Sequence, residues 1–218
     1  QGLKLIKDYL LDDEKGVISD VKEIKAIGHR VVHGGEKYSE PTIIDEEVEE
    51  NIEQLSSLAP LHNPHNLTGI KVVKEVIPDT PQVAVFDTGF HQSLPKKAYT
   101  YAVPYEYYEK YGVRRYGFHG TSHKFVAEQT AKLMEKPLQD LKIITCHLGN
   151  GASMAAVNQG KSIDTSMGLT PLEGLVMGTR SGDIDPSLVP FIAENEDISA
   201  KKVEDILNNE SGLLGISG

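Results

Sequence analysis

The sequence is poor in the features of secreted, membrane-spanning and nucleic-acid-binding proteins. Its 218 residues include one cysteine, Cys146, which excludes an internal disulfide and suits a reducing compartment. No apolar run approaches the length that spans a bilayer, and no secretory signal is visible. The formal net charge is −10, so no sequence-wide basic field would attract nucleic acid. These absences favour a cytoplasmic protein that binds neither membrane nor nucleic acid.

The composition is that of an ordinary globular protein, with 39% hydrophobic and 25% charged residues. The length fits one large domain or parts of two. The first residue is not methionine, and the sequence stops in the glycine-rich segment 211–218, for which we expect a turn. Both features predict that the sequence is a fragment of a longer protein.

The first part of the chain has the alternating pattern of strands and helices that is typical of an α/β fold. In chain order, we expect a strand over 23–32, helices over 45–58 and 66–77, and a buried strand over 82–86. Asp45 is expected to cap the first helix. Apolar residues at spacings of three and four, beside a run of carboxylates, predict that this helix has one buried and one solvated face.

The middle of the chain, 93–116, is rich in tyrosine and interrupted by prolines, so we expect irregular structure and short helices. A helix is expected to follow over 122–135, with Thr121 and Ser122 as its capping residues. Beyond it, the pattern predicts a meander of strands over 142–147, 152–157 and 161–165, joined by tight turns.

Three further expectations concern the meander and the end of the chain. Cys146 lies in an apolar strand, and we expect it to pack in the core. After a loop over 178–185, a helix is expected to start with Pro186 at its first position. A last helix is expected after Ser199.

Arg30 lies near the end of the first expected strand, within the segment 28–35. A guanidinium offers a fork for a planar carboxylate, and Val32, expected on the same face, would form a small apolar wall. The alternative is a surface arginine at a strand end beside core histidines.

Asp87 directly follows the buried strand over 82–86. In open α/β sheets, ligands bind beyond the carboxyl ends of the strands. A carboxylate at this place could be a general base, a partner of Mg²⁺, or only a cap of the following turn.

His119 stands between glycines at the start of an expected helix, where backbone N–H groups and the helix dipole favour an anion. The turn 148–151 could aim further N–H groups at a phosphate, or be a plain hairpin turn. Arg180, held between glycines, resembles a clamp for developing negative charge. Its alternative is a surface ion pair with Asp183 or Asp185.

The eight histidines include pairs spaced by three or four residues, which raises the alternative of a zinc hydrolase. There is no HExxH pattern and no second cysteine, so known zinc patterns do not fit. Magnesium bound through phosphate oxygens and a carboxylate suits these residues better.

Taken together, these segments resemble the acetate kinase (acetokinase) family, which belongs with the sugar kinases, actin and the heat-shock ATPases. The resemblance covers about 26–218, and the segment 116–123 is among its most specific parts. In chain order, the matching segments are GHRVVHGG, APLHNPHN, VFDTGFH, YGFHGTSH, HLGNGAS and GTRSGDIDPS.

The resemblance implies an α/β, ribonuclease-H-like (actin-like ATPase) architecture of two domains, incomplete at both ends. It assigns 1–91 to the later part of the first domain with the acyl site, 92–140 to a connecting segment near the cleft, and 141–218 to the start of the second domain. The implied reaction is a reversible, Mg²⁺-dependent phosphoryl transfer from ATP to acetate, giving acetyl phosphate and ADP, in a homodimer. Because family members are longer at both ends, we expect the 218-residue piece alone to be inactive.

The resemblance also implies roles for single residues. Asp87, His119 and Arg180 would be catalytic, the latter two by stabilising the transferred phosphoryl group. Arg30 would bind the carboxylate of acetate or the acetyl phosphate, and His62 would be a further active-site histidine. The pocket for the methyl group would consist of Val32, Leu61, Phe118 and Pro171. The nucleotide phosphates would meet His147, Leu148, Gly149, Asn150 and Gly151.

Some alternatives stay open within the resemblance. Acetate is ionised at neutral pH, so Asp87 would orient Mg²⁺ or a neighbouring cation at least as much as it moves a proton. A small pocket separates acetate from propionate only weakly, so a kinase for propionate or another short carboxylate is the first alternative. A non-catalytic module is the second.

Overall fold

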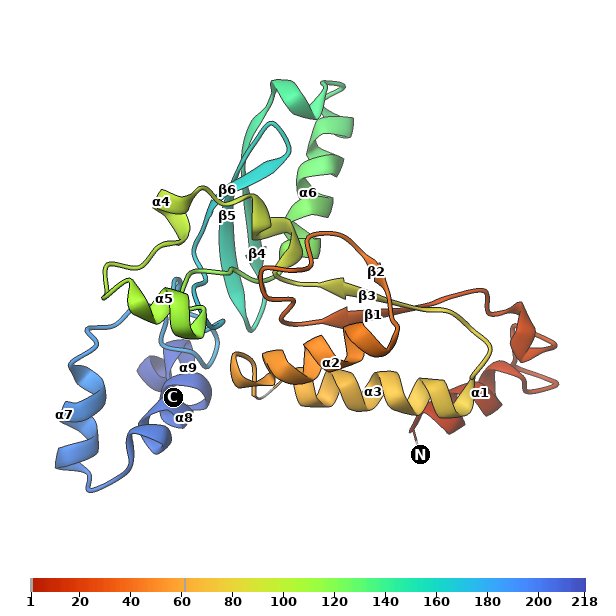
Figure 1. Ribbon diagram of the computed structural model, residues 1–218, viewed down its shortest axis with the longest axis horizontal. Helices are drawn as coiled ribbons and strands as arrows, with labels where there is room; N and C mark the ends of the chain where they lie inside the picture. Colours follow the sequence, from red (N-terminus) through yellow and green to blue (C-terminus); the bar gives the residue numbers. More distant parts are fainter. Residues whose placement is uncertain (1, 61) are drawn as a thin grey trace. The chain divides into compact units, whose positions relative to one another are not determined.

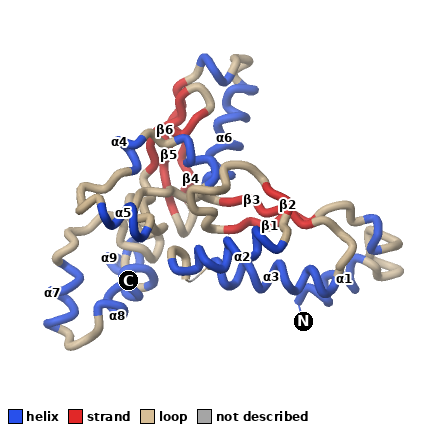
Figure 2. The backbone as a smooth tube through the Cα atoms, viewed as in Figure 1, coloured by secondary structure: helices blue, strands red, loops and turns tan. Residues whose placement is uncertain are grey.

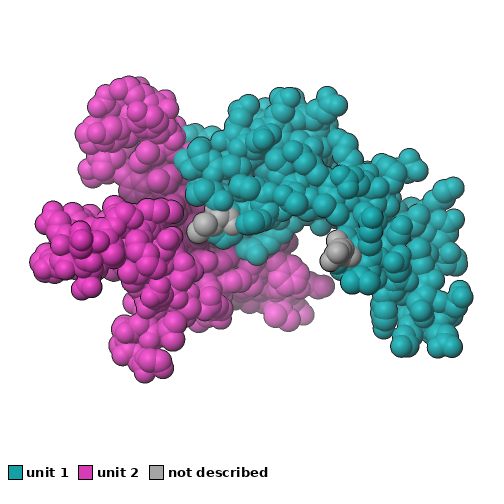
Figure 3. All heavy atoms as spheres, turned by 90° about the horizontal axis from the view of Figure 1, so that it is seen from below, with its two compact units in different colours: residues 1–89 teal, residues 90–218 magenta. Residues whose placement is uncertain are grey.

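Two three-stranded sheets, each with its own helices, organise the chain, as the computed structural model shows for residues 2–60 and 62–218 (Figures 1 and 2). One sheet belongs to a compact unit formed by residues 1–89 and the other to a second unit formed by residues 90–218 (Figure 3). The predicted α/β fold class is confirmed. None of the helices in the described residues has both the length and the apolar character needed to cross a membrane.

The sheet of unit 1 contains β1 (Ile27–Val31), β2 (Thr42–Ile43) and β3 (Gln82–Phe86), in the order β1-β3-β2. β1 and β3 are parallel, whereas β2 is antiparallel to β3. Parallel strands end at the same edge of a sheet, and this register places the ends of β1 and β3 next to each other. The predicted strand over 82–86 is confirmed at both ends.

One face of this sheet is covered by α2 (Glu46–Gln54) and α3 (Asn63–Val76), which lie side by side (Figure 1). The side chain of Asp45 accepts a hydrogen bond of 2.9 Å from the backbone of Val48 and so caps α2 as predicted. The apolar stripe of α2 faces inward, and its acidic residues are exposed except Glu49, which is partly buried and pairs with Lys74. The core cluster consists of Val31, Tyr38, Val48, Ile52, Leu67, Ile70, Ala84 and Phe86.

Three boundaries in unit 1 differ from the sequence-based expectation by several residues. The helix expected over 45–58 ends at Gln54, and a 3₁₀ turn over Leu55–Ser57 follows it. The strand expected from residue 23 begins at Ile27, because Val21–Glu23 form a 3₁₀ turn that Asp20 and Glu23 close as a capping box. The helix expected from residue 66 begins at Asn63, since Pro64 is tolerated in a first helical turn. An N-terminal helix, α1 (Gly2–Leu10), was not anticipated.

Unit 2 contains the predicted antiparallel meander of β4 (Lys142–Leu148), β5 (Ala152–Asn158) and β6 (Lys161–Thr165), in that order. The helix α6 (Gly120–Leu133) packs against β4 and β5 (Figure 2). Its buried face includes Gly120, His123, Ala127 and Ala131. Small residues let the helix approach the sheet closely.

The expectation that Cys146 packs in the core is wrong, because its side chain is exposed. Successive side chains of a strand point to opposite faces. Thr145 is buried and contacts His123 of α6, so Cys146 points to the other face of the sheet. An apolar run identifies a strand without showing which face a helix covers.

The remaining elements are short helices. As expected for the tyrosine-rich segment, α4 (Lys96–Tyr99) and α5 (Glu106–Tyr111) are brief. Near the end of the chain lie α7 (Leu188–Asn195), α8 (Ala200–Asn209) and α9 (Gly212–Ser217). The last predicted helix is confirmed as α8, which Ser199 caps by accepting a hydrogen bond of 3.1 Å from Lys202.

In unit 2, two helix starts differ from the predictions. The cap of α6 is His119, in the left-handed conformation with φ of 57°, and Thr121 and Ser122 lie inside the first turn. α7 begins at Leu188, two residues beyond the predicted start at Pro186. Pro186 instead stands in a turn, where Asp185 accepts a hydrogen bond of 2.9 Å from the backbone of Ser187.

The turn expected over 211–218 is also wrong, because Gly212–Ser217 form the helix α9. The backbone N–H groups of Leu213 and Leu214 donate to the carbonyls of Met177 (2.8 Å) and Gly178 (2.9 Å). A Cβ on Gly212 would overlap the same segment, so glycine is needed for this close approach. Contacts distant in sequence thus place a helix where local composition predicts a turn.

Candidate active site

Arg30 and Asp87 form an ion pair at the carboxyl edge of the unit 1 sheet. Arg30 is the last but one residue of β1, and Asp87 directly follows β3. Arg30 Nε donates to Asp87 Oδ1 at 2.9 Å, and Nη2 donates to Oδ2 at 2.6 Å. These hydrogen bonds raise the pKa of Arg30. The pair is therefore a two-point, charge-assisted contact that fixes the plane of the guanidinium.

The two partners differ in their access to solvent. The Asp87 side chain is 2% exposed, whereas that of Arg30 is 65% exposed. Arginine has five N–H donors, and Asp87 takes two of them. The buried Asp87 thus binds one edge of the Arg30 guanidinium, and the rest of the guanidinium is exposed to solvent. This arrangement suits the binding of a small anion better than the capping of a turn.

The segment after β1 is braced by two asparagines, for which no role was predicted. Asn66 Oδ1 accepts a hydrogen bond of 3.1 Å from the backbone of Val32. The fully buried Asn63 accepts one of 3.1 Å from the backbone of His33 and donates one of 3.0 Å to its carbonyl. The start of α3 therefore positions Val32, two residues beyond Arg30.

One other predicted residue, His62, lies at the same end of α3. His62 is its N-cap, with φ of −129°. Leu61 lies outside the described residues, so its predicted place in a methyl pocket stays a prediction.

In unit 2, His119 and Arg180 meet over the turn between β4 and β5. A Cβ built on Gly151 would lie 3.3 Å from Arg180 Nη1 and 3.5 Å from His119 Nε2. Glycine keeps this space open between the turn and the two side chains. An imidazole, a guanidinium and a glycine turn thus surround one small volume, which is the composition expected of a phosphate site.

The loop that carries Arg180 holds the guanidinium near that volume. Arg180 Nη1 donates to the carbonyl of Pro171 at 3.1 Å, and burial lowers the pKa of Arg180. Asp183 accepts a hydrogen bond of 2.8 Å from the backbone of Gly174. A Cβ on Gly178 would overlap the side-chain amide of Asn150, so the loop packs directly on the turn. The acidic neighbour therefore braces the backbone that presents Arg180.

His147 stacks on His119, with ring centroids 4.0 Å apart and planes inclined by 24°. Its Nδ1 lies 2.9 Å from the hydroxyl of Ser122, and Nδ1 of His119 lies 2.9 Å from the hydroxyl of Ser153. The predicted nucleotide residue His147 and the predicted catalytic residue His119 are therefore neighbours. Serines on α6 and β5 hold both rings.

The segment before His119 is fixed by the buried His91. Its Nε2 lies 3.0 Å from the carbonyl of Phe118, and its Nδ1 lies 2.8 Å from the hydroxyl of Ser162. Burial lowers the pKa of His91 to about 4, so the ring is neutral at pH 7. A carbonyl only accepts hydrogen bonds, so Nε2 carries the proton and Ser162 donates to Nδ1. His91 lies within a recognised motif, VFDTGFH, although its role was not predicted.

Gly117 gives a direct test of this packing. Its φ is +75°, and a Cβ would lie 2.5 Å from Thr165 Cγ2 and 2.8 Å from the His91 ring. We expect Gly117→Ala to lower the free energy of unfolding by about 2–4 kcal/mol, from left-handed strain and overpacking. Thermal denaturation of the full-length protein measures the effect.

The matched control is Gly69→Ala, within α3, where a Cβ meets no atom within 4 Å. Alanine favours a helix, so we expect no loss and a gain of up to about 1 kcal/mol. Equal melting temperatures for Gly117→Ala and the unsubstituted protein would show that this segment is not tightly packed.

Metal ligation by the histidines finds no geometric support. In the part of the chain that the structure describes, no group of three or more His, Cys, Asp or Glu side chains could hold a metal ion. Nitrogens of His119, His123 and His147 face the hydroxyls of serine or threonine.

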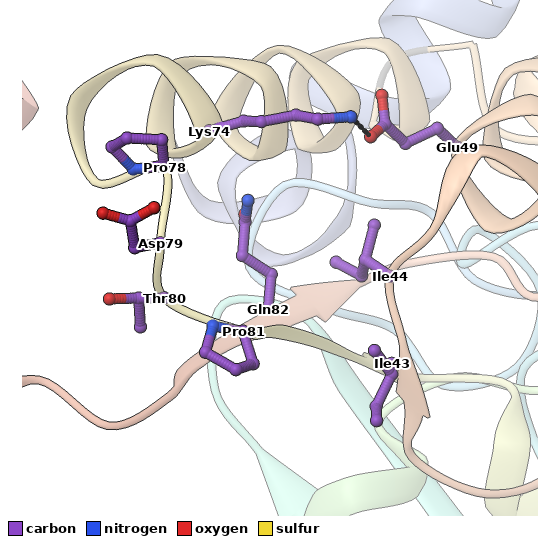
Figure 4. A pocket seen from close by; sticks show the side chains of 9 residues that line it. All are labelled: Ile43, Ile44, Glu49, Lys74, Pro78, Asp79, Thr80, Pro81 and Gln82. Carbon is purple, nitrogen blue, oxygen red and sulfur yellow. Dashed lines mark hydrogen bonds and ion pairs between the residues drawn. The ribbon is translucent and has the colours of Figure 1, made fainter.

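A cavity of about 280 Å³ lies elsewhere in unit 1, beside β2 and the turn before β3 (Figure 4). Lys74 and Glu49 form an ion pair of 2.9 Å along its wall, which neutralises the charge of both. The lining residues are Ile43, Ile44, Glu49, Lys74, Pro78, Asp79, Thr80, Pro81 and Gln82. None of them is a predicted site residue.

The predicted residues therefore form two groups. Arg30 and Asp87 meet in unit 1, whereas His119, Arg180, Gly151 and the ring of His147 meet in unit 2. That both groups serve one site stays a prediction.

Comparison with known proteins supports a common origin with one family. The family model described as the acetokinase family matches residues 1–218. An acetate kinase of Halothermothrix orenii is 66% identical over 218 residues, covering 100% of this chain and 55% of that protein. An acetate kinase of Thermotoga maritima is 62% identical over 217 residues, covering 100% of this chain and 54% of that protein.

Solved structures agree with the sequence comparison. The crystal structure of Porphyromonas gingivalis acetate kinase matches with a TM-score of 0.94 and 47% identity, covering 100% of this chain and 54% of that one. A propionate kinase from Francisella tularensis matches with a TM-score of 0.93 and 50% identity, covering 100% and 55%. The chain spans about half the length of the curated relatives it matches.

Proposed function

Because the chain belongs to the acetokinase family, we propose that the full-length protein is an acetate kinase, EC 2.7.2.1. A carboxylate oxygen of acetate attacks the γ-phosphorus of ATP, and the bond from that phosphorus to the β–γ bridging oxygen breaks. The products are acetyl phosphate and ADP, and the reverse reaction regenerates ATP. The observation that carries the proposal is the meeting of His119 and Arg180 over the Gly151 turn.

Phosphoryl transfer requires mainly alignment and positive charge around the three equatorial oxygens. His119 and Arg180 would contact these oxygens, because both face the volume that Gly151 leaves open. The turn Leu148, Gly149, Asn150 and Gly151, with His147, would contact the phosphates of the nucleotide. Donors fixed in advance stabilise the developing charge without reorganisation.

Arg30 would bind the carboxylate of acetate or the phosphate of acetyl phosphate. Asp87 orients it through two hydrogen bonds, which favours a positioning role for Asp87 over proton transfer. Acetate carries no proton to remove at neutral pH, so the chemistry agrees. We propose that Val32, Leu61, Phe118 and Pro171 enclose the methyl group.

Magnesium would bind through phosphate oxygens of ATP and a carboxylate. Among the described residues, no cluster of carboxylates and histidines could hold it, and both oxygens of Asp87 already accept hydrogen bonds from Arg30. Bound to the phosphates, Mg²⁺ would neutralise part of their charge. Each oxygen of Asp87 accepts one hydrogen bond from Arg30 and has a second lone pair, so Asp87 could also accept a hydrogen bond from the water of a hydrated ion.

The remaining assignments are part of the same proposal. Residues 1–91 would complete a first ribonuclease-H-like domain, 92–140 would connect the domains, and 141–218 would begin the second. The protein would act as a cytoplasmic homodimer, in line with the resemblance and with its single thiol.

The proposal is tested by incubating the full-length protein with ATP, Mg²⁺ and acetate and trapping acetyl phosphate as its hydroxamate. We expect product only when all three are present. No product in either direction, from a folded preparation, would reject the kinase and favour a non-catalytic module.

The alternative substrate is propionate, since one of the similar structures is a propionate kinase. A hydrophobic pocket discriminates one methylene by roughly 1–3 kcal/mol. Comparing kcat/KM for the two acids decides which is preferred.

Val32 is the residue that we expect to set this preference. Its backbone is held by Asn66 beyond Arg30, so its side chain has a fixed place. Val32→Ala should raise the ratio of kcat/KM for propionate to that for acetate by about 10-fold, because the pocket gains room for one methylene. Val17→Ala, at a residue 78% exposed, is the control and should leave the ratio unchanged. An unchanged ratio in Val32→Ala would remove Val32 from the pocket.

A further inference from the structure

A chain of hydrogen bonds runs from His119 into the interior of unit 2. Nδ1 of His119 lies 2.9 Å from the hydroxyl of Ser153, which lies 2.8 Å from Nε2 of His123. Nδ1 of His123 lies 2.8 Å from the hydroxyl of Thr145, which donates to the carbonyl of Ala155 at 3.4 Å. Ser153, His123 and Thr145 are all buried, so water does not compete for these contacts.

The carbonyl at the inner end sets the direction of the chain. Because the carbonyl of Ala155 can only accept, the hydroxyl of Thr145 donates its one hydrogen to that carbonyl. The Thr145 oxygen must therefore accept a hydrogen bond from Nδ1–H of His123. Burial lowers the pKa of His123 to about 4, so its ring carries one proton at pH 7. Nε2 of His123 then accepts the only hydroxyl hydrogen of Ser153. Ser153 in turn accepts from Nδ1–H of His119.

We propose that Thr145, His123 and Ser153 are positioning residues that fix the tautomer of His119, with a proton on Nδ1 and with Nε2 turned toward Gly151 and Arg180. The titratable or charged groups that face the rings of His119 and His123 are Arg180 from the loop, His147 from β4 and His91, whose ring lies 5.7 Å from that of His123.

What this tautomer of His119 means for phosphoryl transfer rests on the proposed function. A neutral His119 offers a lone pair, not a donor, at Nε2. It can donate to a phosphoryl oxygen only as the imidazolium, and it then adds a positive charge beside Arg180. His119 is thereby set up as a cationic partner of the transferred group rather than as a neutral hydrogen-bond donor.

The experiment is ¹⁵N NMR of the histidine ring nitrogens in the full-length protein, at a pH where His119 is neutral. The His119 signals are assigned from their loss in His119→Asn. We expect the Nδ1–H tautomer in the unsubstituted protein. Thr145→Val keeps the shape but removes the hydroxyl, so His123 can carry its proton on Nε2 and Ser153 can donate to His119. We therefore expect His119 to shift toward the Nε2–H tautomer in this variant.

The control is Thr145→Ser, which keeps the hydroxyl and should keep the original tautomer. An Nε2–H tautomer in the unsubstituted protein, or no shift in a folded Thr145→Val, overturns the inference. These spectra need no turnover, so they decide the tautomer even if the protein makes no acetyl phosphate, an outcome that would reject only the proposed function.

A kinetic readout connects the tautomer to the reaction. Ser153→Ala breaks the chain next to His119, and we expect kcat to fall about 10–100-fold with little change in the KM for acetate. An unchanged kcat would separate the chain from catalysis and overturn the positioning role. If Ser153→Ala does not fold, Thr145→Val gives the same test through kcat.

Discussion

Arg180→Ala in the full-length protein is expected to lower kcat for acetyl phosphate formation by about 10²–10³-fold, the usual effect of losing one preorganised donor to a transition state. Arg180 is half-buried and is aimed by Pro171 at the volume that it shares with His119. In such a place its charge is screened less by water than on an open surface. Steady-state kinetics in the direction of acetyl phosphate formation measure the effect.

Two further variants show whether the loss of kcat in Arg180→Ala is specific to the guanidinium at this position. Arg180→Lys keeps a charge but lacks the planar fork, so we expect an intermediate loss. Lys74→Ala removes an exposed cation that pairs with Glu49 in unit 1, and should change kcat by less than 2-fold, within the usual scatter for surface sites. If Arg180→Ala costs only a few-fold, Arg180 has no part in the chemical step.

The second large effect concerns the pair of Arg30 and Asp87. We expect Arg30→Ala to lower kcat/KM for acetate by about 10²-fold, because a charge-assisted contact to the substrate is lost. Asp87→Ala should cost a similar factor if Asp87 acts by holding the guanidinium. The double variant should then be no worse than Arg30→Ala alone, since both substitutions remove one function.

This double-mutant cycle separates two roles for Asp87. If Asp87 transfers a proton or orients Mg²⁺ on its own, the losses multiply to about 10⁴-fold. The matched control is the exposed pair of Lys201 and Glu204, whose removal should leave kcat/KM unchanged. Multiplied losses would contradict a purely positioning role for Asp87.

Local sequence patterns predicted the parts of the fold that depend on neighbours in the chain. The strand Gln82–Phe86 was predicted at both ends, because Pro81 and Asp87 bracket an apolar run. The meander of β4, β5 and β6 was also predictable, since glycine and asparagine mark its turns.

The errors arose where contacts distant in the sequence decide the structure. The helix α9 depends on backbone hydrogen bonds to Met177 and Gly178, which composition does not reveal. Cys146 was assigned to the core because an apolar strand does not show which of its faces α6 covers. His119 replaced the expected caps of α6 because its segment is held by His91.

The candidate site shows the same division. The motifs identified residues whose chemistry suits a phosphate, such as His119 and Arg180. They did not reveal the residues that hold these side chains, although Ser153, His91 and Asn63 lie within the same motifs. A hydroxyl or an amide is a common partner for many groups, so its role becomes visible only when its neighbour in space is known.

The central claim is that Arg30, His119 and Arg180 serve one reaction, in which Arg30 binds the acyl substrate while His119 and Arg180 contact the transferred phosphoryl group. The most direct test is a crystal structure of the full-length protein with ADP, Mg²⁺, acetate and a planar aluminium fluoride, which is an analogue of the phosphoryl group in the transition state. We predict fluoride atoms within about 2.7–3.2 Å of His119 Nε2 and Arg180, and the acetate carboxylate on Arg30. A complex in which the fluoride contacts His119 and Arg180 while Arg30 lies on a separate surface would contradict the account.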